Sequence, residues 1–162
     1  MAIGLGGVAK GYAVDRACGV LRRAGLEHFV VNSGGDLRAF GTHEGQLWRA
    51  AIRDPRGPGN VAVLPLSNLA LATSGDYERY AVIDGRRYCH IIDPRTGRPA
   101  DGCRSVSVLA PTAALADALA TAVFVLGPER GLALAEGWDG VECFIIDAEG
   151  GKHLSAGLRG GR

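Results

Sequence analysis

The feature that most constrains the fold is a two-residue turn, Asp84-Gly85, set between two runs typical of β-strands. The run YAVI precedes the turn and the run RRYCHII follows it. Because both central residues of a type I′ turn adopt positive φ, an Asp-Gly pair suits that turn, which joins antiparallel strands. The sequence therefore predicts an antiparallel hairpin at residues 80–92.

Further short strand patterns surround this hairpin, and fewer helical patterns accompany them. Strands are expected over 28–32, 36–40, 47–53, 61–66, 69–72, 105–109 and 141–147. Helices are expected over 8–24, 111–126 and 128–136, with loops over 54–60 and 94–102 and a Gly-rich tail. In the first helix the predicted apolar face contains Ala9, Ala13, Ala17, Val20, Leu21 and Ala24. Strands outnumber helices and follow one another as hairpins, which predicts an α+β fold with a mainly antiparallel sheet and two to three packed helices.

Composition excludes several classes of protein. The 162 residues are 47% hydrophobic and 22% charged, which is typical of one globular domain with its own core. Eighteen basic and seventeen acidic side chains leave a net charge of +1, so a nucleic-acid partner is not expected. The four cysteines show no zinc or C-x-x-C spacing, and no signal peptide precedes Gly4. A glycine loop with so little chain before it suggests a portion of a longer protein.

The helical pattern at residues 112–127 contains a single charged residue, Asp117. A carboxylate among alanines and leucines is costly to bury unless it meets a cation or hydrogen-bond donors. Thr121 lies one turn further along the same face. Carboxylate and hydroxyl oxygens are suitable ligands for Mg²⁺, which needs few protein carboxylates. The alternative is an aspartate on the solvent face of the helix with a threonine beside it.

The run GLGGVAKGYAVD joins a glycine loop to a helix start, where free N–H groups and the helix dipole favour a phosphate. Lys10 lies in the first turn and could reach such an anion. The run also fits the G-x-G-x-x-A dinucleotide pattern, but no strand precedes it and the next strand ends in Asn32-Ser33 without the acidic residue that pattern requires. A nicotinamide dinucleotide site is therefore not expected. The alternative is a helix-entry loop with packing glycines.

Two further segments contain polar candidates. His90 is expected in the second strand of the hairpin, where it could accept a proton or contact a nucleotide, or be a half-buried structural residue. The run ATSGDY at residues 72–77 offers clustered hydroxyls, including Ser74, but could equally end a strand in a turn.

Taken together, five segments in this order resemble the FAD:protein FMN transferases, formerly called the ApbE thiamine-biosynthesis lipoproteins. The segments are GLGGVAKGYAVD, VVNSGGDLRAFG, ATSGDYERY, YCHIIDPRTGRP and SVSVLAPTAALADALATAVFVLGPE. The resemblance covers nearly all of residues 3–146 and implies an ApbE-like fold. It also implies a Mg²⁺-dependent enzyme that cleaves FAD, places FMN on a threonine or serine hydroxyl of an acceptor protein and releases AMP.

The resemblance also assigns roles to individual residues. It implies a metal site formed by the side chains of Asp117 and Thr121 and the main-chain carbonyl of Gly7. It implies FAD contacts from Lys10, Ser74, His90 and the main chain of Ile92. His90 is in addition the candidate catalytic base. The sequence departs from the family at Gly4, Cys89 and Ala120, where Asp, Ser and a further acid occur in members.

The resemblance has consequences for the organisation of the chain. Residues 1–162 are expected to form a single domain equivalent to the C-terminal portion of the family, with the N-terminal portion absent. Members are typically periplasmic, membrane-anchored lipoproteins. Two alternatives to FMN transfer remain: an FAD pyrophosphatase, in which water replaces the acceptor, and a non-catalytic flavin- or nucleotide-binding remnant. A homodimer is one way to cover apolar faces that the missing portion would otherwise cover.

Overall fold

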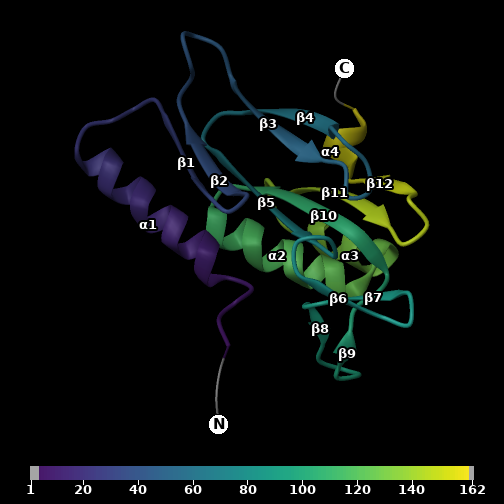
Figure 1. The fold of residues 1–162 in the computed structure, drawn as a ribbon. Coiled ribbons are helices and arrows are strands. Elements are labelled where there is room, and N and C mark those ends of the chain that lie inside the picture. Colours follow the sequence, from purple (N-terminus) through teal and green to yellow (C-terminus); the bar gives the residue numbers. More distant parts are fainter. Residues whose placement is uncertain (1–3, 161–162) are drawn as a thin grey trace.

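A six-stranded sheet forms the centre of the structure, a computed structural model that describes residues 4–160 (Figure 1). The strand order is β1-β2-β5-β10-β11-β12, and every neighbouring pair is antiparallel. The predicted α+β class with a mainly antiparallel sheet is therefore confirmed.

The helices are α1 (Ala9–Arg23), α2 (Ala113–Leu126), α3 (Pro128–Glu136) and the short α4 (Ala156–Arg159). The strands of the main sheet are β1 (Phe29–Ser33), β2 (Asp36–Phe40), β5 (Leu69–Gly75), β10 (Cys103–Ala110), β11 (Glu142–Asp147) and β12 (Lys152–Leu154). Three further hairpins pair β3 (Trp48–Arg53) with β4 (Asn60–Leu66), β6 (Tyr80–Ile83) with β7 (Arg86–Cys89), and β8 (Ile92–Asp93) with β9 (Arg98–Pro99).

Both faces of the sheet are covered, so the molecule has two apolar cores. On one face α2 lies across β5 and β10, with α1 and α3 beside it (Figure 1). On the other face the β3–β4 hairpin contributes Ile52 and Leu66, which cluster with Leu71, Leu109 and Phe144 from the sheet. The central strand β10 is consequently buried along nearly its whole length, as expected for a strand between two layers.

Helix α2 occupies the centre of the helical layer because it is apolar on nearly every side. Val123 and Phe124 are completely buried. The helix begins after Thr112, whose extended backbone and hydroxyl cap the N–H of Leu115 at 3.3 Å. It ends at Gly127, which has φ of +79°, and Pro128 then begins α3.

Most of the predicted apolar face of the first helix is not buried, although Leu21 of that face packs against the core. The residues of α1 that are buried are Gly11, Val14 and Cys18, whereas Ala9, Ala13 and Val20 are exposed. The reason is the close approach of α1 to α2, which requires a residue without a side chain at the contact. Gly11 meets that requirement, and the alanines therefore face outward.

Other differences from prediction concern the ends of strands. The turn at Asp84-Gly85 has φ of +50° and +76° and joins β6 to β7 as predicted, but β7 ends at Cys89 and His90 lies outside it. The expected loop at 94–102 contains β9, and the Gly-rich tail contains β12 and α4. This tail is ordered by the pairing of β12 with β11 and by the Ser155 hydroxyl, which accepts a hydrogen bond from the Cys143 N–H at 2.8 Å.

The four cysteines are buried and free, so none forms a disulfide. Burial raises the pKa of the Cys103 and Cys143 thiols to about 12, which keeps them protonated at neutral pH. Between residues 4 and 160, none of the helices combines the length and the apolar character needed to cross a membrane.

The contact between α1 and α2 yields a first prediction. A Cβ on Gly11 would lie 2.2 Å from the Ala113 carbonyl oxygen and 2.8 Å from Asp117 Cβ. Gly11→Ala should therefore lower the free energy of unfolding by at least ~2 kcal/mol through overpacking, measured by urea denaturation. Gly19→Ala in the same helix is the matched control, because its nearest atom is the end of the flexible Arg23 side chain at 3.4 Å.

The control should gain about 0.5–1 kcal/mol, since alanine is the better helix former. Equal stability of the two variants would show that α1 does not depend on close contact with α2.

Candidate functional site

Asp117 lies at the contact between α1 and α2 and is 6% exposed. Its Oδ2 atom accepts a hydrogen bond of 3.0 Å from the backbone N–H of Gly11. The N–H groups of a first helical turn have no acceptor within their own helix, so a carboxylate is a suitable partner for them. The alternative of an aspartate on the solvent face is therefore wrong.

Oxygen atoms that could bind a cation come from two segments outside α2 and lie around Thr121, one helical turn from Asp117. The Thr121 Oγ1 atom is 3.2 Å from the Ser74 hydroxyl at the end of β5. A Cβ on Gly7 would lie 3.4 Å from Thr121 Oγ1, so the loop before α1 reaches the same place. Because the Gly11 N–H donates to Asp117, it does not close the usual helical bond to the Gly7 carbonyl. The structure thus brings together Gly7, Ser74 and Thr121, next to Asp117.

Lys10 contacts a second buried carboxylate, Asp36, which the local sequence patterns do not mark as a site residue. The Lys10 Nζ atom is 3.1 Å from Asp36 Oδ1 and donates to the Gly34 carbonyl at 3.3 Å. Burial raises the pKa of Asp36 to about 6, the Lys10 hydrogen bond opposes the rise, and the Asp117 charge adds to it. In the sequence Asp36 directly follows Ser33-Gly34-Gly35, a segment typical of an ordinary turn. The contact with Lys10, which the sequence does not show, is what distinguishes Asp36.

Asp15 holds the two helices together at the other end of their contact. Its carboxylate accepts hydrogen bonds from the N–H groups of Ala113 and Ala114, each at 2.9 Å, at the start of α2. It also forms an ion pair of 2.7 Å with Arg38 on β2. Asp15 therefore caps α2 from α1 and fixes the register in which Gly11 meets Asp117.

The oxygen set around Asp117 matches the requirements of Mg²⁺. It offers one carboxylate, two hydroxyls and a main-chain carbonyl, and Mg²⁺ is usually held by one or two carboxylates together with substrate phosphates. Asp36 adds a buried oxygen, Oδ2, that has no hydrogen-bond partner within the described part of the chain. No group of three or more His, Cys, Asp or Glu residues suited to a metal occurs among residues 4–160, so a thiolate- or imidazole-based site is not indicated there.

The predicted residues His90 and Ile92 lie near the smaller hairpins, His90 between β7 and β8 and Ile92 in β8. His90 follows β7, is exposed, and its Nδ1 lies 3.1 Å from the Arg79 carbonyl. The interpretation of His90 as a half-buried strand residue is therefore wrong. Ile92 belongs to β8 and is 49% exposed. None of the hydrogen bonds recorded for these two residues reaches Asp117 or Thr121.

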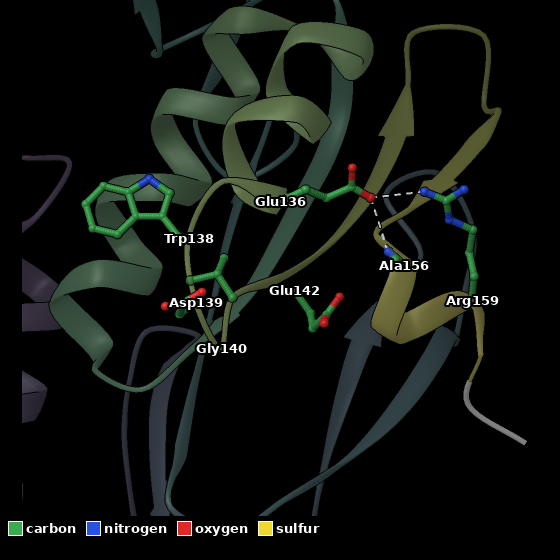
Figure 2. Close-up of a pocket in the computed structure, with 8 residues that line it drawn as sticks. Glu136, Trp138, Asp139, Gly140, Glu142, Ala156 and Arg159 are labelled. Atoms are coloured by element: carbon green, nitrogen blue, oxygen red, sulfur yellow. Dashed lines mark hydrogen bonds and ion pairs between the residues drawn. The ribbon is translucent and has the colours of Figure 1, made fainter.

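A hollow elsewhere on the described surface contains none of the predicted site residues. It lies between the end of α3, the start of β11 and α4, and Figure 2 shows Glu136 bound to the Ala156 N–H and to Arg159. These contacts tie the tail to α3. The hollow is accordingly explained as a junction of secondary-structure elements.

Comparison with known proteins gives a consistent result. The sequence profile of the "ApbE family" matches residues 1–145. The "FAD:protein FMN transferase" of Treponema pallidum is 40% identical, covering 98% of this chain and 47% of the relative. The protein of the same name from Rhodobacter capsulatus is 50% identical over 77% of this chain and 24% of its own length.

Solved structures show the same similarity. The ApbE protein of Thermotoga maritima superposes with a TM-score of 0.90 at 42% identity, covering 97% of this chain and 52% of that one. The flavin transferase ApbE of Vibrio cholerae has a TM-score of 0.82 at 36% identity, covering 94% and 50%. This chain thus spans about half the length of these structures, and half or less of the curated relatives above.

The Asp15 contacts yield a second prediction. Asp15→Asn removes the charge that caps α2 and pairs with Arg38, so the free energy of unfolding should fall by about 1–3 kcal/mol in urea denaturation. Asp139→Asn makes the same change in charge at an exposed position and should alter stability by less than about 0.5 kcal/mol. Similar effects of both variants would contradict the role of Asp15 as a clamp.

Proposed function

Because this chain belongs to the ApbE family, we propose that it carries the cation- and phosphate-binding part of a transferase that moves FMN from FAD to a hydroxyl of an acceptor protein. The observation that supports this most strongly is Asp117, a carboxylate buried in an apolar helix among further oxygen donors. A divalent cation and the FAD phosphates would give these groups the partners that burial otherwise denies them.

The reaction replaces the phosphoanhydride bond between the two halves of FAD with a phosphoester bond to the acceptor. The oxygen of a threonine or serine hydroxyl attacks the flavin-side phosphorus of FAD, the P–O bond to the AMP phosphate breaks, and AMP leaves. Gly7, Asp117 and Thr121 would hold Mg²⁺, which when bound neutralises charge on the pyrophosphate. Lys10, whose side chain pairs with Asp36, and Ser74, whose hydroxyl is 3.2 Å from Thr121 Oγ1, would contact the phosphates.

The hydroxyl proton requires an acceptor, and His90 is our candidate. A carbonyl oxygen can only accept a hydrogen bond, so the contact with the Arg79 carbonyl requires the proton to be on Nδ1 of His90. In the neutral imidazole Nε2 then carries the free lone pair, and no hydrogen bond to it occurs among residues 4–160. The Ile92 main chain, two residues later, is the proposed contact for the nucleotide.

One assay separates the three possible activities. The chain is incubated with FAD, Mg²⁺ and an acceptor protein bearing a threonine, and both AMP and covalently bound flavin are measured. AMP with flavin on the acceptor supports the proposed transfer. AMP without labelled acceptor supports an FAD pyrophosphatase, and release of neither product by a chain that binds FAD supports a non-catalytic binding protein.

A third prediction tests the cation site. Asp117→Asn keeps an oxygen that can accept the Gly11 N–H but removes the charge, so metal-dependent release of AMP from FAD should fall by at least ~100-fold. Asp139→Asn should leave the rate unchanged. Circular dichroism and urea denaturation establish that both variants are folded. Unchanged AMP release by folded Asp117→Asn would overturn the assignment of Asp117.

A fourth prediction concerns oligomeric state. Helix α1 exposes Tyr12 and Val20, each at 58%, together with Ala9 and Ala13. A second copy of the chain packed on this face would bury them, and we therefore expect light scattering to give the mass of a dimer, with Val20→Glu shifting it to the monomer. A monomer at high concentration for the unaltered chain would contradict this expectation.

A further inference from the structure

Asp36 is the most deeply buried carboxylate in the described part of the structure, with an exposure of 1%. Its Oδ1 atom pairs with Lys10 Nζ at 3.1 Å, but no N–H, ammonium or hydroxyl group among the described residues donates a hydrogen bond to its Oδ2 atom, and the Asp117 carboxyl beside it adds to the burial that raises the pKa of Asp36. A buried carboxylate oxygen without a partner loses its hydration and gains nothing in return. Such an atom in a native structure requires an explanation.

The surroundings of Asp36 contain an excess of negative charge. Two consecutive residues of α1 connect it to Asp117: Lys10 binds Asp36 by its side chain, and Gly11 binds Asp117 by its N–H. The Asp117 charge acts directly on Asp36, since it contributes to the raised pKa of that carboxyl. Of these two buried carboxylates only Asp36 forms an ion pair, with the single ammonium group of Lys10, and Asp117 has a backbone N–H as its partner, which leaves room for a further positive charge.

The backbone before Asp36 is shaped to present it in this place. Gly34 and Gly35 have φ of +56° and +96°, which side chains rarely permit, and the Asn32 side chain accepts the Gly35 N–H at 3.2 Å. The turn also directs the Gly34 carbonyl to Lys10 Nζ at 3.3 Å. Lys10 is thus held from two sides by one tight turn, and Asp36 supplies the charged contact.

We propose that Asp36 is a positioning residue of the cation site, which orients Lys10 and supplies a second negative charge for the divalent cation that Asp117 binds. This inference rests on the proposed function. A purely structural role makes different predictions, because removal of a structural ion pair lowers stability and leaves cation affinity unchanged. In a positioning role, the buried charge of Asp36 lowers the stability of the fold without a cation and raises the affinity of the site for a cation.

The test measures binding of Mn²⁺ alone, by the loss of the free-ion electron paramagnetic resonance signal, with neither FAD nor acceptor present. Asp36→Asn preserves shape and an acceptor for Lys10 but removes the charge. We expect its Mn²⁺ affinity to fall about 10- to 100-fold, as for other outer residues of metal sites, with no loss of stability in urea. Asp139→Asn, which makes the same change in net charge, should bind as the unaltered chain does.

The outcomes distinguish this inference from the proposed function. If Asp117→Asn abolishes Mn²⁺ binding and Asp36→Asn does not weaken it, the role of Asp36 is overturned and the cation site stands. If Asp117→Asn binds Mn²⁺ normally, the cation site itself fails and this inference fails with it. Lower stability of Asp36→Asn with unchanged affinity would assign Asp36 a structural role. Asp36→Ser replaces Asp36→Asn in the same measurement if the latter does not fold.

Discussion

At the crossing of α1 and α2 the Gly11 N–H lies 3.0 Å from the Asp117 carboxylate, and a Cβ on Gly11 would lie 2.2 Å from the Ala113 carbonyl oxygen. The same contact therefore sets the distance between the helices and gives a buried carboxylate its hydrogen bond. It also brings the loop containing Gly7 to Thr121. Because one backbone position serves packing and the site together, a change that separates the helices should disturb both.

The three aspartates at the site differ in their burial and in the number of their hydrogen-bond and ion-pair partners. Asp15 is paired with Arg38 and two backbone N–H groups, so its charge is well compensated. Asp36 and Asp117 are more deeply buried and have fewer partners, Lys10 for Asp36 and the Gly11 N–H for Asp117. Carboxylates with strong partners stabilise a fold, whereas under-compensated ones mark places where a ligand completes the set. The number of partners thus separates Asp15, which has a structural role, from Asp36 and Asp117, for which we propose a functional one.

Local signals in the sequence predicted most of the elements, and long-range contacts explain what they missed. The Asp84-Gly85 turn and the extent of α3 were predicted because turn and capping chemistry is local. Asp117 stood out because a single charge in an apolar helix needs a partner. Asp36 did not, since its meaning comes from Lys10, 26 residues away in sequence. The buried face of α1 was missed for a related reason: its Gly11 contact depends on α2.

The residues proposed for the reaction lie in two parts of the fold, and different contacts stabilise these two parts. Gly7, Asp117 and Thr121 lie where α1 and α2 meet against the sheet, whereas His90 lies after a two-stranded hairpin in which Tyr80 and Val82 are exposed. An isolated hairpin has little stability of its own. One contact that ties this hairpin to the end of β5 is the ion pair of 3.8 Å between Arg87 and Asp76, and within the hairpin the Arg87 guanidinium lies over the Tyr80 ring. Asp76 follows the end of β5, two residues after Ser74. Strand β5 therefore connects the hairpin to the proposed cation site, and removal of the ion pair between Asp76 and Arg87 should loosen the hairpin next to His90, the proposed base, while Gly7, Asp117 and Thr121 stay in place.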